Sequence, residues 1–151
     1  MVWLGNLMQW SRLVPELVVN DYDAAKGFYQ DVLGFQLCFE RPENRFGYLD
    51  LAGAQIMLLE RPSDTAPLPS VTTSRLHFQI EVDALEPLLQ RLRDTNHVLE
   101  QAPYIARYRG EGCVFVQREF FVRDLDGYLL RFFEHLAEEP APVSSGCMQT
   151  G

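Results

Sequence analysis

The chain has few cysteines and no long apolar run. It contains three cysteines in 151 residues, Cys38, Cys113 and Cys147, and none of them stands at the spacing of a CxxC or Cys/His metal site. An odd number of widely separated cysteines is typical of free thiols in a reducing compartment, which favours a cytoplasmic protein. No stretch approaches the roughly 18 consecutive apolar residues of a membrane-spanning helix. The sequence therefore argues against a disulfide scaffold, a zinc-binding module and a membrane partner.

Positive charge is also scarce. The chain has 13 Lys and Arg residues against 21 Asp and Glu residues, which gives a net charge of −8. Proteins that bind nucleic acids concentrate Lys and Arg, so we expect no nucleic-acid partner. An acidic protein attracts cations, including cationic small molecules; the alternative is that the acidity serves only solubility.

The chain contains an internal repeat. Residues 13–21 and 76–84 lie 63 positions apart, and both alternate in polarity, end in acidic or amide residues and lead into an amphipathic helix. Three further strands are expected after each helix. The predicted strands cover residues 13–19, 35–40, 46–51 and 55–60 in the first copy and 76–82, 97–101, 114–123 and 128–134 in the second. This order, strand, helix and three strands repeated twice, predicts an α+β fold.

The repeats set the expected domain boundaries. We expect a single domain over residues 13–136, with repeats at 13–60 and 75–135 and a linker at 61–74 that is rich in Pro, Ser and Thr. Residues 1–12 form an N-terminal extension that either docks on the body or a partner chain, or is a disordered leader. Residues 137–151 are expected to form a flexible tail.

The first turns of the two helices carry capping signals. Asn20 or Asp21 is expected to cap the first helix. Gly34 is expected to end it by adopting a left-handed backbone conformation. Asp83 is the expected cap of the second helix. Pro87 falls in its first turn, where a missing N–H group costs little.

Strand alternation separates an apolar face from a mixed face. In the strand at residue 76, one face is wholly apolar and should pack under a helix, whereas the other carries His77, Gln79 and Glu81. Polar and aromatic side chains together on a concave face are typical of a small-molecule pocket, although a plainly solvated face is the alternative. The candidate ligand-binding residues are Glu16, Tyr48, Gln55, Met57, His77, Gln79, Tyr104, Tyr108, Phe115, Glu119, Phe121, Arg131 and Phe133.

The sequence also predicts an ion pair and a mobile loop at this candidate pocket. Glu16 and Arg131 are expected to form an ion pair across its floor, because an unpaired buried charge is costly; alternatively, Arg131 anchors an anionic part of a ligand. Residues 107–112 read as a mobile glycine-containing loop, whose flanking aromatic residues either stack on a flat ligand or form the rim of a plain hairpin. Cys38 has no evident base beside it and no Ser/His/Asp set is visible, so we predict no catalytic residue.

Two motifs then resemble those of a known superfamily. Phe28-Tyr29 followed by Leu33-Gly34-Phe35, and the turn Asp-Leu-Asp-Gly-Tyr at residues 124–128, resemble the vicinal oxygen chelate superfamily. This superfamily includes glyoxalase I, extradiol dioxygenases, fosfomycin resistance proteins and bleomycin resistance proteins. The resemblance covers residues 13–135 and implies two βαβββ modules that form a curved mixed sheet around a cavity, the glyoxalase/bleomycin resistance fold.

The resemblance also implies where metal-dependent members would bind a divalent ion. The corresponding positions are Val14, Met57, His77 and Arg131, of which only His77 is a suitable ligand. A stable divalent site needs about three protein ligands, so we expect no bound metal and no cofactor.

The branch without the metal is the bleomycin resistance type. Residues 14–17, 46–49 and 127–132 resemble that branch, which implies a homodimer that sequesters a cationic or aromatic ligand between its subunits. The alternative function is a metal-dependent glyoxalase, lyase or dioxygenase of the same superfamily, which would need His77 together with Glu119 or Glu81.

Overall fold

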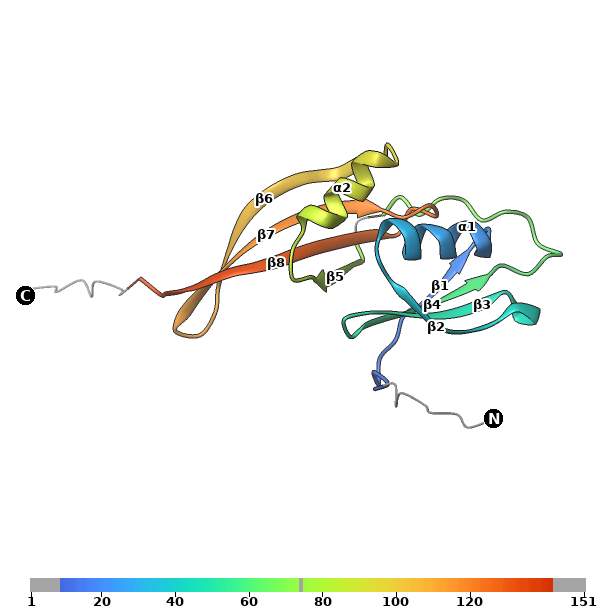
Figure 1. Ribbon diagram of the computed structural model, residues 1–151, viewed down its shortest axis with the longest axis horizontal. Coiled ribbons are helices and arrows are strands. Elements are labelled where there is room, and N and C mark those ends of the chain that lie inside the picture. Colours follow the sequence, from blue (N-terminus) through green and yellow to red (C-terminus); the bar gives the residue numbers. More distant parts are fainter. Residues whose placement is uncertain (1–8, 74, 143–151) are drawn as a thin grey trace, which may run out of the picture.

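The computed structural model describes residues 9–73 and 75–142, which form two βαβββ modules (Figure 1). The first module contains β1 (Glu16–Val19), α1 (Tyr22–Gly27), a π-helical turn (Phe28–Val32), β2 (Gln36–Arg41), a 3-10 turn (Pro42–Asn44), β3 (Phe46–Leu51) and β4 (Ala54–Glu60). The second module contains β5 (His77–Glu81), α2 (Glu86–Asp94), β6 (Leu99–Arg109), β7 (Cys113–Arg123) and β8 (Leu129–Pro140).

Each module forms its own four-stranded mixed sheet. Sheet A has the strand order β1-β4-β3-β2 and sheet B has the order β5-β8-β7-β6. In both, the first strand of the module runs parallel to the last, and the other neighbours are antiparallel. The identical order in the two modules confirms the predicted repeat and the α+β class. None of the described helices is long and apolar enough to cross a membrane.

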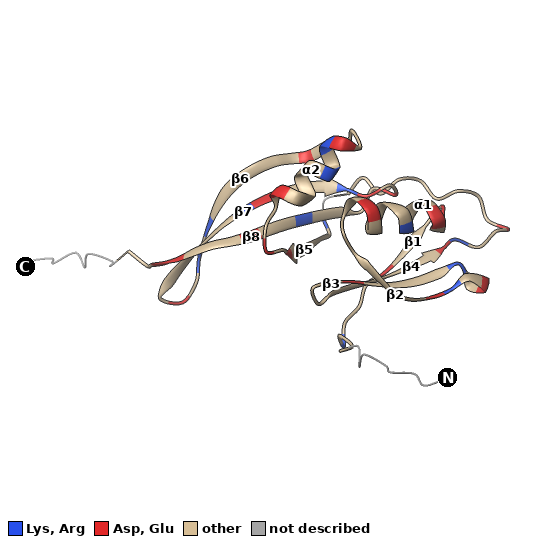
Figure 2. Cartoon of the chain, in the orientation of Figure 1, with Lys and Arg blue, Asp and Glu red and all other residues tan. Residues whose placement is uncertain are grey.

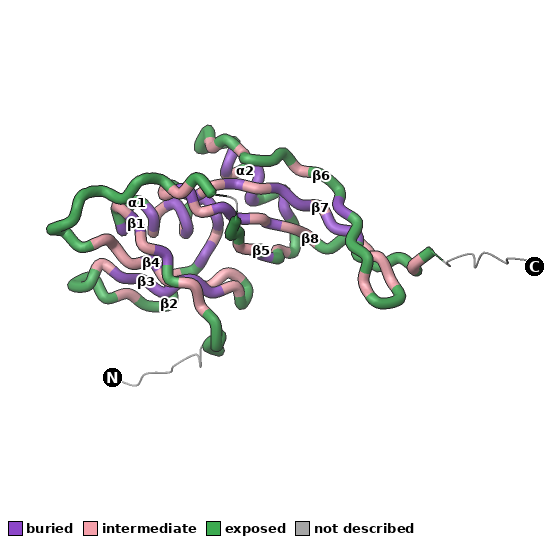
Figure 3. The backbone as a smooth tube through the Cα atoms, turned by 180° about the vertical axis from the view of Figure 1, so that it is seen from behind, coloured by how far each residue is buried: buried purple, intermediate pink, exposed green. Residues whose placement is uncertain are grey.

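One hydrophobic core joins the two modules (Figure 3). Buried side chains of α1, α2 and the adjoining sheet faces belong to a single cluster, in which the rings of Phe120 and Phe132 stack at 5.7 Å. The helical regions also contact each other directly, because Arg91 Nε of α2 donates to the Val32 carbonyl of the π-helical turn at 2.7 Å. Burial of these apolar faces, at about 25 cal/mol per Å², is the main stabilising contribution.

The two motifs that carry the superfamily resemblance contact each other. The Tyr29 hydroxyl donates to Asp124 Oδ2 at 2.8 Å, while Asp124 Oδ1 accepts from the N–H groups of Asp126 and Tyr128 at 3.0 and 2.8 Å. The Tyr128 hydroxyl in turn donates to the Val18 carbonyl of the first module at 2.9 Å. The turn between β7 and β8 is thereby fastened to both the helix and β1 of the other module.

This contact predicts a specific pH dependence of stability. Burial raises the pKa of Asp124 to about 6, against the lowering effect of its hydrogen bonds. A carboxyl whose pKa is raised on folding stabilises the protein fully below its unfolded value of 3.8, and this contribution is lost as the pH rises through about 6. Between pH 4 and 6.5, we expect the native protein to lose on the order of 2 kcal/mol of unfolding free energy that Asp124→Asn does not lose, measured by urea denaturation. Equal changes in unfolding free energy over this pH range in the two proteins would contradict the raised pKa of Asp124.

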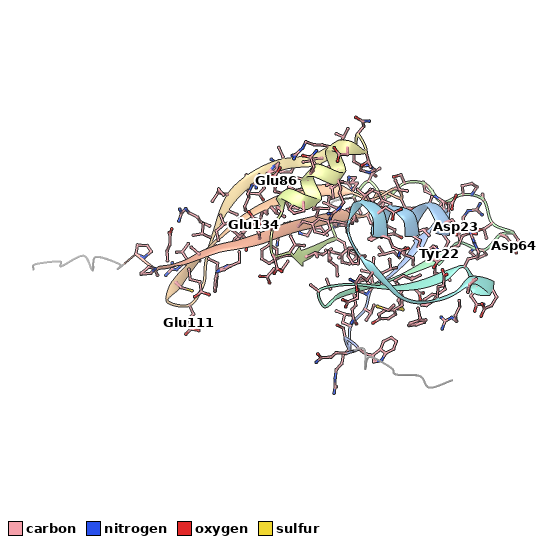
Figure 4. All side chains as sticks on the ribbon, viewed as in Figure 1. Tyr22, Asp23, Asp64, Glu86, Glu111 and Glu134 are labelled. Carbon is pink, nitrogen blue, oxygen red and sulfur yellow. The ribbon has the colours of Figure 1, made fainter. Side chains whose placement is uncertain are left out.

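The two helices begin in different ways. Asp21 caps α1, since its Oδ1 accepts from the N–H group of Ala24 at 3.0 Å. The predicted cap Asp83 is wrong for α2, because the helix has Leu85 as its N-cap. Glu134 of β8 accepts the Leu85 N–H at 2.6 Å, and Figure 4 labels this residue beneath the start of α2. A distant strand therefore supplies the carboxylate that the local sequence was expected to provide.

Several strand limits differ from those predicted. β6 ends at Arg109 rather than near residue 101, and β8 continues to Pro140 rather than ending near residue 134. Both extensions pair with the long β7, as in the Cys113–Pro140 partnership. Residues 107–109, half of the expected mobile loop at 107–112, are therefore strand, and the remaining turn contains Gly112 with φ of 76°. β1 begins later than predicted, at Glu16.

Candidate functional site

Four of the candidate residues lie on one face of sheet A. Met57 is the register partner of both Glu16 and Tyr48, and Gln55 is the partner of Asp50 two positions further along β3. Tyr48 and Gln55 are buried, whereas Glu16 is exposed. This is the face of the sheet opposite to the one that packs against α1.

Two aromatic residues that the sequence analysis did not select complete this face. The rings of Phe39 and Tyr48 stack at 5.4 Å, and the ring of Trp10 stands edge-on to them at 5.7 and 4.9 Å. Phe39 occupies the strand position next to the candidate Tyr48, so pairing of β2 with β3 could have revealed it. Trp10 gives no such signal, because it precedes β1 and reaches the sheet only through tertiary contact.

Gln55 holds the segment that carries Trp10. Its Oε1 accepts from the Ser11 N–H at 2.9 Å and from the Tyr48 hydroxyl at 2.7 Å. Its Nε2 donates to the Gln9 carbonyl at 2.8 Å and to Asp50 Oδ1 at 3.1 Å. A cleft of about 880 Å³ lies beside this segment, between β2 and the β3–β4 turn.

The other nine candidate residues share one face of sheet B. Arg131 is the register partner of Gln79 and Phe121, and Glu119 is the partner of Phe133 and Tyr104. The alternation of β5, β6, β7 and β8 places the rest on the same side. These residues are His77, Gln79, Tyr104, Tyr108, Phe115, Glu119, Phe121, Arg131 and Phe133.

A buried carboxylate organises the middle of this face. Glu119 is 0% exposed, and its Oε1 accepts from the hydroxyls of Tyr104 and Tyr108, the latter at 2.7 Å. Its Oε2 accepts from Gln117 Nε2 at 2.7 Å. Burial alone would raise the pKa of Glu119, but these hydrogen bonds outweigh it and hold the pKa below its ordinary value. Glu119 therefore stays ionised, and burial together with this carboxylate raises the pKa of both tyrosines.

The expected ion pair between Glu16 and Arg131 does not form. The Arg131 guanidinium instead donates to Gln79 Oε1 and lies 6.0 and 5.9 Å from the ring centres of Tyr108 and Phe121. Glu16 belongs to sheet A and is exposed, whereas Arg131 belongs to sheet B. Gln79 and Arg131 also line a small pocket of about 250 Å³ on this face, together with Tyr108, Phe115 and Gln117.

A further cleft joins the two modules. Its volume is about 430 Å³, and it is lined by residues 54–56 of β4 and residues 77–80 of β5. Gln55, His77 and Gln79 are thus the candidate residues that the chain brings together from different modules. The remaining candidates are divided between the two sheet faces.

A family model described as the Glyoxalase/Bleomycin resistance protein/Dioxygenase superfamily matches residues 11–132. The chain belongs to this superfamily. Among proteins of curated function, none matches the chain significantly.

Solved structures of the superfamily are similar to the chain over most of its length. A superfamily member from Vibrio splendidus 12B01 is 34% identical and covers 83% of this chain and 98% of its own, with a TM-score of 0.36. TioX from Micromonospora sp. ML1 is 24% identical over 84% of this chain and 100% of its own, with a TM-score of 0.59. Lactoylglutathione lyase from Agrobacterium tumefaciens is 19% identical over 82% and 93%, with a TM-score of 0.53. The last two likenesses establish the fold.

The residues at the superfamily's expected metal positions do not fit a divalent ion. Val14 and Met57 are apolar, Arg131 is a cation, and the His77 ring packs at 5.5 Å from that of Phe121. Glu119, one of the two alternative partners of His77, uses both carboxylate oxygens in hydrogen bonds. Within residues 9–73 and 75–142, no three His, Cys, Asp or Glu side chains lie together as a metal site would require.

Proposed function

We propose that this superfamily member is a metal-free, non-catalytic protein of the bleomycin resistance type that sequesters an aromatic small molecule. The observation that supports this most strongly is the combination of aromatic rings and polar groups on both sheet faces: Phe39 stacks on Tyr48 in sheet A, and Arg131 lies over Phe121 in sheet B. Aromatic surfaces with a few fixed polar groups are typical of small-molecule sites. The net charge of −8 favours ligands with an overall positive charge, of which bleomycin is the specific candidate.

We also propose that the complete site forms between two copies of the chain. Phe39, Tyr104, Tyr108 and Phe115 are each more than a third exposed on these two sheet faces, and exposed apolar patches mark interaction sites. The 880 and 250 Å³ hollows are each lined by one module, so each has an open side. A second copy that places its sheet A opposite sheet B would close both hollows. Light scattering of the purified protein should then give the mass of a dimer.

The binding function is tested by titration. We expect bleomycin to bind with micromolar or tighter affinity in isothermal titration calorimetry, and we expect Trp10→Ala to weaken binding about tenfold, because about 1.4 kcal/mol of ring contact is lost. Leu68→Ala, which truncates another exposed apolar residue, is the matched control and should bind as the native protein does. Failure of bleomycin to bind would contradict the proposal that bleomycin is the ligand.

Elemental analysis separates this function from the metal-dependent alternative. The purified protein is expected to contain much less than one equivalent of Zn, Ni, Mn or Fe per chain. About one equivalent that disappears in His77→Ala would favour a metal-dependent enzyme of the superfamily instead.

A further inference from the structure

Arg131 differs from the other arginines of sheet B in its surroundings (Figure 2 colours Lys and Arg blue, and Asp and Glu red). Arg107, Arg118 and Arg123 each have a carboxylate oxygen within 4 Å, and Arg109 is exposed to solvent. Arg131 is half-buried, and in the described part of the chain no carboxylate lies within ion-pair distance of it.

The immediate contacts of Arg131 leave part of its hydrogen-bonding capacity unused. One terminal nitrogen donates to Gln79 Oε1, while Nε is buried without a partner among the described residues. Glu119 is the carboxylate on the neighbouring strand, but Tyr104, Tyr108 and Gln117 already occupy its two oxygens. Its charge offsets that of Arg131 only from a distance.

The half-buried guanidinium of Arg131 therefore lacks both a counter-ion and a hydrogen-bond acceptor for Nε. An unsatisfied buried donor costs roughly 1 to 3 kcal/mol, and a buried charge without a counter-ion is more costly. The planar donor fork of arginine matches a carboxylate, which can accept from two of its N–H groups at once. The pocket beside Arg131 has aromatic walls, Tyr108 and Phe115, and a volume of about 250 Å³, which suits a small ring system.

We propose that Arg131 and Gln79 form an anion-recognition site, so that the ligand class of this face is a planar aromatic carboxylate. The carboxylate lies on the guanidinium of Arg131, and the aromatic ring lies against Tyr108 and Phe115. This inference rests on the proposed function, because it assumes that the face of sheet B binds aromatic molecules. It deepens that function by specifying the charge of the group that the site selects.

The test uses three probes of one ring system that differ in charge: 2-naphthoate, neutral 2-naphthamide and the 2-naphthylmethylammonium cation. In calorimetric titrations of the full-length protein at low ionic strength, we expect 2-naphthoate to bind about tenfold more tightly than 2-naphthamide. Arg131→Met should remove this preference and Arg131→Lys should retain part of it. Arg107→Met removes a cation of the same sheet that already has a carboxylate partner, and it should leave the preference unchanged.

A second measurement does not depend on the folding of the Met variant. The side-chain Nε–H signal of Arg131 in a ¹⁵N spectrum, assigned by its loss in Arg131→Lys, should shift when 2-naphthoate is added. The neutral amide at the same concentration should leave it in place.

The outcomes distinguish this inference from the proposed function. Equal or tighter binding of the neutral or cationic probe by the native protein would overturn the anion site and leave an aromatic-binding protein. An unchanged preference in Arg131→Met would overturn it as well. Absence of binding by all three probes and by bleomycin would overturn both proposals.

Discussion

Replacing Gly127 with alanine is expected to lower the free energy of unfolding by roughly 4 kcal/mol. Gly127 has φ of +91°, a left-handed conformation that costs other residues about 1 to 2 kcal/mol. A Cβ atom there would also lie 2.2 Å from the Val71 carbonyl oxygen and 2.8 Å from the Val71 nitrogen. These are backbone atoms of the linker, and the Val71 N–H donates to the Asp126 carbonyl at 2.8 Å. The linker would therefore have to leave the β7–β8 turn.

Gly53→Ala is the matched control for this prediction. Gly53 has φ of +95°, which is nearly the same backbone conformation, but no atom lies within 4 Å of the position that its Cβ would take. We expect only the conformational cost of about 1 to 2 kcal/mol in this variant. Urea denaturation of both variants measures the difference, which isolates the clash with the linker. Equal losses in the two variants would show that the linker moves away without cost.

Local sequence patterns were sufficient to predict the architecture. The strand alternation assigned Gln79, Arg131 and Phe121 to one face, and the register of β5, β8 and β7 places them there. The two motifs that suggested the superfamily also have a physical reason to occur together, since Tyr29 donates to Asp124 across the modules. Period-two alternation and short turns depend on nearest neighbours in the chain, and for that reason they can be read without a structure.

Apart from the limits of β1, β6 and β8, the errors concern contacts between distant segments. The sequence suggested Asp83 as the cap of α2 because it is close by, but Glu134 reaches the helix from β8. It also suggested that Glu16 and Arg131 pair, because both lie on mixed faces, whereas these faces belong to different sheets. Trp10 was not selected because its role depends on how Gln55 binds the segment before β1. The spacing of residues along the sequence predicts none of these contacts, because the partners lie far apart in the chain.

The net charge of the chain likewise does not predict the charge of the group that a local site binds. The overall acidity of the chain favours a cationic ligand, but the local surroundings of Arg131 favour an anionic group. A net charge acts at long range and influences encounter, whereas a half-buried guanidinium acts on the group that touches it. An aromatic molecule that carries both a positive and a negative group would satisfy the long-range and the local preference. The anionic, neutral and cationic naphthyl probes report which of these two electrostatic effects is larger.

Glu119→Leu is expected to cost roughly 3 kcal/mol of stability at pH 7. The variant keeps a side chain of similar bulk but removes the acceptor of three hydrogen bonds. Tyr104 and Tyr108 are partly exposed and can turn to water, whereas the buried Gln117 amide cannot. Most of the loss therefore comes from the Gln117 donor and from the loosened β6–β7 pairing. Glu81→Gln, which changes an exposed carboxylate on the same face, should have little effect.

The pH dependence of this variant separates the role of the charge from that of packing. Because the folded-state pKa of Glu119 is lowered, its stabilising contribution is present above its ordinary value of 4.5 and is lost as the pH falls through the lower folded value. The native protein should thus lose stability on acidification in a range where Glu119→Leu does not. Asp124 has the opposite sign, since its contribution disappears as the pH rises toward about 6. If the stability of Glu119→Leu falls in parallel with that of the native protein below pH 4.5, folding does not lower the pKa of Glu119, and the hydrogen bonds from Tyr104, Tyr108 and Gln117 do not favour its ionised form.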